Sequence, residues 1–204
     1  AGSTGGGIKV IRFQLLLKGM LRPIFRYCAS DAWQFDFAAH DVGQYPILNG
    51  QVYCENKLEG QMPIEECGNM ITLMAAICDA DGNADFAKPH MPMLEQWAKY
   101  LIEFGEDPGE QLCTDDFAGH LAHNVNLSAK AIMGVEALAQ IKKLAGDEAA
   151  YADLHAKAAA MAAVSDGAIV GSAIMKIIAQ QKPDTAGEVY RFVKELKDAV
   201  RSVQ

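Results

Sequence analysis

The sequence predicts a mainly α-helical protein, and three observations lead to that fold class. Residues 70–77, 94–104 and 121–144 each repeat apolar side chains at the spacing that puts them on one face of a helix. In the last stretch we expect Leu127, Ala131, Val135 and Leu138 to point inward. Turn-forming residues at 81–83 and 105–109 end the first two of these stretches. No convincing strand intervenes, and helix following helix is the pattern of an all-α domain.

The other elements of the helical domain are predicted from less regular patterns. Residues 8–13 could form a short strand or begin a helix, and residues 15–28 are helix-like. We expect a break or kink at Pro23, because proline supplies no amide hydrogen. Residues 30–53 are rich in turn formers and aromatics and predict a long ordered loop, of the kind that is often functional. The alanine-rich residues 147–163 predict a last helix of this domain.

The pattern changes after Ala163. A short apolar run at 168–170 is followed by a Gly-Ser turn and a helix to 178, and an amphipathic helix covers 189–200. Strand, turn and helix make a short α/β segment. We therefore divide the chain into a glycine-rich start and linker (1–15), a helical domain (16–163) and an α/β tail (164–204).

Composition narrows the classes of partner. The net charge is −8 with no long Lys or Arg run, so we expect neither nucleic acid nor an anionic membrane as a partner. No apolar run reaches the roughly eighteen residues of a membrane span, and the glycine-rich start lacks the features of a signal peptide. The five cysteines form no Cys-x-x-Cys pair, so we expect buried free thiols, with one disulfide left open, and no metal or cofactor.

Four ordered segments carry a resemblance to a known family. They are residues 17–23 (LKGMLRP), 40–46 (HDVGQYP), 61–70 (QMPIEECGNM) and 113–124 (CTDDFAGHLAHN). Together they resemble the six-hairpin helical domain of the glutaminase A family over about residues 16–160. The resemblance implies part of an (α/α) six-hairpin toroid, hydrolysis of glutamine to glutamate and ammonia, and export to the periplasm or outside the cell. The family's β-rich N-terminal region and earlier hairpins are absent from this chain.

The tail resembles a different family. Residues 166–174 (DGAIVGSAI), followed by 189–200, are similar to the last strand and helices of the tryptophan synthase α subunit, a (β/α) barrel. That resemblance implies phosphate binding by Gly171 and Ser172, although the rest of the barrel is missing. We therefore consider a mosaic or misassigned chain, with its seam near 163–165.

Two acidic pairs are the candidate catalytic residues. Hydrolysis needs a proton donor and a base, and two carboxyls in different surroundings can fill these roles. The pairs are Glu65–Glu66 and Asp115–Asp116, each placed before a predicted helix, and we expect them to face a common cleft. We prefer Glu66 and Asp116. The alternative is that these acids cap helices and interact with helix dipoles.

Other polar side chains could contact a small-molecule substrate. The candidates are His40, Asp41, Tyr45, Asn69, His123 and Asn124. His120 and His123 lie three apart on a predicted helix face, but they lack the glutamate of the zinc-protease motif, so metal binding is not expected. The asparagines could equally cap loops. Trp33, Tyr45 and Trp97 could stack on a sugar ring, or pack in the core.

These observations leave four functions open. The first is a glutaminase-family hydrolase that uses paired carboxylates, and the second is a six-hairpin glycosidase. The third is an inert helical module or mosaic chain, whose open hairpin faces would need another chain to cover them. The fourth is a tryptophan synthase α subunit.

Overall fold

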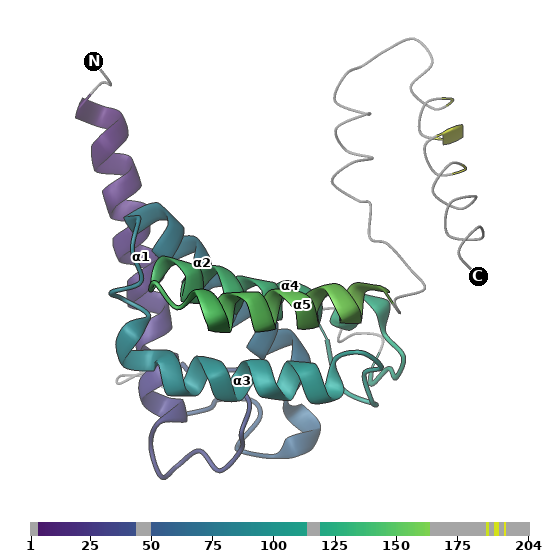
Figure 1. Ribbon diagram of the computed structural model, residues 1–204. Helices are drawn as coiled ribbons and strands as arrows, with labels where there is room; N and C mark the ends of the chain where they lie inside the picture. The colour runs from purple at the N-terminus through teal and green to yellow at the C-terminus, as the bar shows by residue number, and fades with distance from the viewer. Residues whose placement is uncertain are drawn as a thin grey trace. The chain divides into compact units, whose positions relative to one another are not determined.

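A computed structural model of the chain describes residues 4–43, 50–113 and 119–163, with Gly187, Tyr190, Arg191 and Lys194 in the tail. The chain divides into two compact units, 1–164 and 165–204. The described residues of the first unit form five α-helices: α1 (Thr4–Cys28), α2 (Pro63–Asp81), α3 (Met91–Phe104), α4 (Val125–Leu144) and α5 (Glu148–Ala163) (Figure 1). Two short 3-10 helices, η1 (Leu58–Gly60) and η2 (Lys88–His90), precede α2 and α3. The mainly α-helical prediction is confirmed.

Helix α1 is longer and less interrupted than the sequence predicted. Residues 8–13 are helical, and Pro23 lies inside the helix instead of ending it. Leu21 and Phe25, on either side of Pro23, are 0% and 1% exposed. The burial of these two side chains offsets the loss of the backbone hydrogen bond that proline cannot donate.

The ends of α2 and α4 follow local chemistry. Helix α2 stops at Gly82, whose φ of 68° suits glycine, as the predicted turn at 81–83 requires. Helix α4 begins at Val125, four residues later than the periodicity indicated. The Asn124 side chain accepts a hydrogen bond from the Asn126 amide and caps it. His120 and His123 therefore precede the helix and share no helix face.

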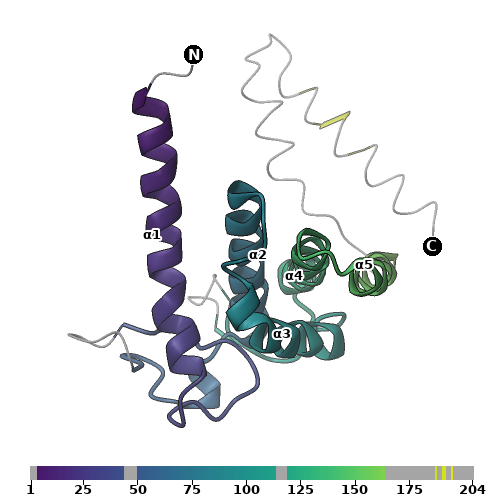
Figure 2. The same cartoon turned by 60° about the vertical axis from the view of Figure 1, so that its left-hand side comes forward.

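The core is built around α4, which packs against both α2 and α5 (Figure 2). The four residues predicted to point inward from α4 are all 0–1% exposed: Leu127, Ala131, Val135 and Leu138. Two glycines let α2 and α4 approach closely. A Cβ on Gly134 would lie 3.0 Å from the Gly68 Cα, and a Cβ on Gly68 would lie 2.7 Å from the Lys130 carbonyl oxygen. This contact holds the first turns of α2 against α4.

Helix α1 leaves part of its apolar surface open. Leu15, Leu16 and Met20 are 62%, 58% and 55% exposed. That another chain covers open hairpin faces stays a prediction. Among the described helices none is both long and apolar enough to cross a bilayer.

The four described residues of the tail are helical. The predicted strand at 168–170 lies outside the described residues, as do Gly171 and Ser172.

Candidate functional site

The candidate site is built on the start of α2. Pro63 sits at the beginning of the helix, where its missing N–H costs nothing, and Glu65 and Glu66 follow in the first turn. Adjacent residues on a helix point in different directions, so the two carboxylates have different surroundings.

Glu65 is the buried member of the pair. It is 2% exposed and forms a salt bridge with Lys130 of α4. A buried carboxylate needs such a partner, because desolvation of an isolated charge is costly. The contact ties α2 to α4 at the point where Gly68 permits their close approach.

Glu66 faces a histidine from a distant loop. Its Oε1 lies 3.3 Å from Nδ1 of His40, and the two side chains are 13% and 29% exposed. The preceding loop residues are fixed by thiols of two helices: the Ala38 amide donates to Cys67 Sγ at 3.3 Å, and the Ala39 amide donates to Cys28 Sγ at 3.4 Å. A carboxylate and an imidazole at this separation, still open to solvent, can hold and transfer a proton.

A buried glutamine connects His40 to the segment that leads into α2. Gln61 is 1% exposed, and its Oε1 accepts from the His40 amide at 3.3 Å. The same oxygen accepts from Gln51 Nε2, and Gln61 Nε2 donates back to Gln51 Oε1, both at 3.0 Å. This amide pair fixes the His40 backbone beside α2.

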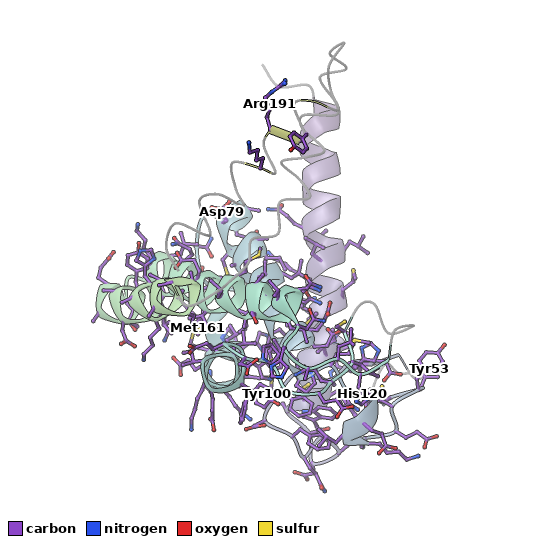
Figure 3. All side chains as sticks on the ribbon, turned by 90° about the vertical axis from the view of Figure 1, so that its right-hand side faces the viewer. Tyr53, Asp79, Tyr100, His120, Met161 and Arg191 are labelled. Carbon is purple, nitrogen blue, oxygen red and sulfur yellow. The ribbon has the colours of Figure 1, made fainter. Side chains whose placement is uncertain are left out.

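The Asp41 carboxylate organises the same loop by accepting hydrogen bonds from backbone amides. Its Oδ2 accepts from the amides of Val52 and Tyr53, each at 2.7 Å. Tyr53 is 86% exposed, and Figure 3 shows it at the periphery. Burial, and then the neighbouring Asp41 carboxylate, raise the pKa of the Cys54 thiol to about 12. Substrate contact by Asp41 stays a prediction.

The remaining predicted contacts are spread more widely. Asn69 lies one turn after Glu66, half-buried on the same face of α2. Asn124 caps α4 and donates to Cys113 Sγ at 3.4 Å. His123 Nδ1 lies 2.6 Å from Asp107 Oδ1, with both side chains at least 70% exposed.

Asp115, Asp116 and Tyr45 lie outside the described residues. The described residues that flank 114–118 contact the region around the start of α2. Gln111 Oε1 accepts from the Ile64 amide at 3.1 Å, and the Leu121 amide donates to the Gln111 carbonyl at 3.1 Å. The His120 ring lies 2.9 Å from the carbonyl of Glu59 in η1.

Three residues of this region were missed by the sequence analysis: Gln61, Gln111 and Lys130. Gln61 opens one of the family-like segments, which was a usable signal. Gln111 and Lys130 have no pattern that marks them, because their roles depend on contacts across 47 and 65 residues.

Trp33 and Trp97 belong to the core. They are 7% and 1% exposed, and Trp33 Nε1 donates to the Phe37 carbonyl at 2.8 Å. The alternative that these two rings stack on a sugar is therefore wrong.

All five cysteines are free thiols, and Cys54, Cys67, Cys78 and Cys113 are buried, so the disulfide alternative is also wrong. Within the described ranges, His, Cys, Asp and Glu side chains form no group of three that could hold a metal ion.

Comparisons with known proteins extend the sequence resemblance. The family model of the glutaminase A six helical-hairpin domain matches residues 12–196. The chain is 37% identical over 132 residues to glutaminase A of Aspergillus oryzae (strain ATCC 42149 / RIB 40), covering 64% of this chain and 19% of that protein. It is 25% identical over 184 residues to a probable glutaminase of Arthroderma benhamiae (strain ATCC MYA-4681 / CBS 112371), covering 62% and 21%. No solved structure gives a significant match.

The chain thus spans about a fifth of the length of these curated relatives. The family match crosses the supposed seam at 163–165 and includes most of the tail. The resemblance of the tail to tryptophan synthase therefore has no support, and neither has the mosaic interpretation built on it. The chain belongs to the glutaminase A six helical-hairpin domain family.

Proposed function

We propose that this chain forms part of a glutaminase, an enzyme that hydrolyses the side-chain amide of glutamine to glutamate and ammonia. In this proposal Glu66 lies at the reacting centre. Membership of the family carries this proposal. The names of both relatives, a glutaminase and a probable glutaminase, support it.

The chemistry assigns the two acids of the first turn to different tasks. Glu65 is buried against Lys130 and stabilises the packing of α2 on α4. Glu66 is more accessible and has His40 beside it, so it can take a proton from water or give one to the leaving amine. Amide hydrolysis requires both transfers, and we assign the other one to a second carboxyl group.

The second carboxyl in this proposal comes from Asp115 or Asp116, with Asp116 preferred. Support comes from the residues around that pair. Gln111 before it and His120 after it contact Ile64 and Glu59, close to Glu66 in the chain. Of the polar residues proposed to touch the substrate, we retain Asn69 first, because it shares a helix face with Glu66.

The test is ammonia release from L-glutamine by the complete polypeptide that contains this chain, with aryl glycosides as a parallel screen. We expect His40→Asn and Asp116→Asn each to lower kcat by about 10²-fold or more, the usual size of a general acid–base contribution. His155→Asn is the matched control. His155 also faces a glutamate, Glu136, at 2.8 Å, but on the exposed surface of α4 and α5.

Each outcome has a clear reading. Glycoside cleavage without ammonia release would replace the glutaminase proposal by the glycosidase alternative. Absence of both activities would leave an inert helical module. Full activity in both His40→Asn and Asp116→Asn would remove the proposed site while leaving the reaction in place.

A further inference from the structure

A second site of interest, which Glu66 does not line, lies between α1 and the start of α3. A cavity of about 620 Å³ opens there. Its walls combine apolar and basic side chains, among them Arg22, Phe25, Arg26, His90, Pro92 and Met93. Small-molecule sites have this size and this mixture of apolar lining with a few polar groups.

The two arginines carry positive charge without a described carboxylate beside them. Arg22 and Arg26 are four residues apart, so they project from the same face of α1. No acidic residue lines the cavity, and the first turn of α3 contains none. Across the described residues, neither guanidinium forms an ion pair, whereas Lys18 on the same helix is paired with Asp81. Acidic residues outnumber basic ones by 26 to 18 in this chain, so a cavity with two arginines and no acidic residue in its lining is unusual for it.

Two of the basic groups at the cavity, Arg22 and His90, contact aromatic rings. The Arg22 guanidinium carbon lies 5.8 Å from the centroid of the Phe86 ring, which is a cation–π contact. The His90 ring stacks on Phe25 with centroids 4.2 Å apart. The arginine stem and the imidazole are therefore positioned before any ligand arrives.

We propose that this cavity binds a small organic anion, whose carboxylate or phosphate oxygens pair with Arg22 and Arg26 while its carbon part packs against Pro92 and Met93. The planar guanidinium fork matches both oxyanions. The apolar wall explains why an organic anion suits the cavity better than an inorganic ion. This inference does not depend on glutaminase activity, because neither Glu66 nor His40 lines the cavity.

The test is calorimetric titration of the chain with benzoate, phenyl phosphate and benzamide at constant ionic strength. Benzamide has nearly the shape of benzoate and lacks its charge. We expect millimolar binding of at least one anion and at least tenfold weaker binding of benzamide, because charge-assisted hydrogen bonds account for a factor of ten or more. The tighter of the two anions identifies carboxylate or phosphate as the preferred group.

Variants locate the binding. Arg22→Gln and Arg26→Gln should each weaken the preferred anion about tenfold, and Arg26→Lys should weaken it less, since lysine keeps the charge without the fork. Lys99→Gln is the control, because it removes one charge from α3 at a residue that lines a different cavity. Both arginines are exposed, so we expect their replacement to leave the melting temperature unchanged. Measuring the melting temperature of each variant checks that it is folded. Equal binding of benzoate and benzamide, absence of binding by both anions, or wild-type affinity in both glutamine variants would overturn the proposal.

Discussion

Replacement of Gly68 by alanine tests the close contact that positions the candidate site. An added Cβ would lie 2.7 Å from the carbonyl oxygen of Lys130 and 3.1 Å from its carbonyl carbon. Both are backbone atoms of α4, so they cannot rotate away as a side chain could. Helices α2 and α4 would have to separate, and the Glu65–Lys130 salt bridge bridges that same gap.

Two opposing effects set the size of the change. Alanine in place of glycine inside a helix gains about 1 kcal/mol from helix propensity. Overpacking a well-filled interior costs about 1–3 kcal/mol, and a clash with backbone belongs at the upper end of that range. We therefore expect a net loss of about 1–2 kcal/mol in the free energy of unfolding. With a urea dependence of about 2 kcal/mol per M, the middle of the usual range for small proteins, the midpoint should fall by roughly 0.5–1 M.

Gly19→Ala is the matched control for this prediction. Gly19 is also inside a helix, α1, but a Cβ there would meet nothing within 4 Å. That variant should gain about 0.5–1 kcal/mol from propensity alone. If Gly68→Ala raised the urea midpoint as much as Gly19→Ala does, the proposed contact between α2 and α4 would be refuted.

Three further predictions follow from burial and charge. Glu65→Gln should lower the free energy of unfolding by about 1–3 kcal/mol because it removes the buried carboxylate that pairs with Lys130. Glu55→Gln, in the exposed pair of Glu55 with Lys57, should change it by less than about 1 kcal/mol. Urea titration compares the two variants, and equal effects would show that the buried salt bridge contributes no more than the exposed one. Burial is the main cause that raises the pKa of Cys54 to about 12, so iodoacetamide at pH 8 should alkylate this thiol at least tenfold more slowly in the native chain than in the unfolded one, measured by mass spectrometry; comparable rates would argue against burial. Burial, and then the charge of Arg22, lower the pKa of His90 below 6.5. The unfolded chain then binds a proton that the folded chain excludes, so this residue costs stability as pH falls through about 6.5. His90→Gln should therefore lose less stability than the wild type between pH 7.5 and 5.5, and an identical loss would show that His90 contributes nothing.

The helices could be predicted because apolar periodicity reports directly on burial. Leu127 and Leu138 were placed inward correctly for this reason. The start of α4 could not be placed by the same signal, since residues 121–124 tolerate a helix. The helix begins only after Asn124 because the Asn124 side chain caps it and because His123 has a positive φ of 55°, which is not a helical conformation.

The candidate site could be predicted only in part. The family-like segments contain both His40 and Glu66. Their proximity could not be predicted, because the two residues are 26 positions apart in the sequence. The different surroundings of Glu65 and Glu66 follow from helix geometry and from the position of α4, which no local sequence pattern contains. The same holds for Gln111, whose side chain reaches the start of α2 from 47 residues away.

The most direct measurement is kcat for ammonia release from L-glutamine by the complete polypeptide carrying Glu66→Gln, beside a Glu136→Gln control. Glu136 also faces a histidine, at 2.8 Å, but at the surface. We expect Glu66→Gln to lower kcat by about 10²-fold or more with an unchanged melting temperature, while the control retains wild-type turnover. Wild-type turnover in Glu66→Gln would contradict the assignment of this carboxylate to the reaction.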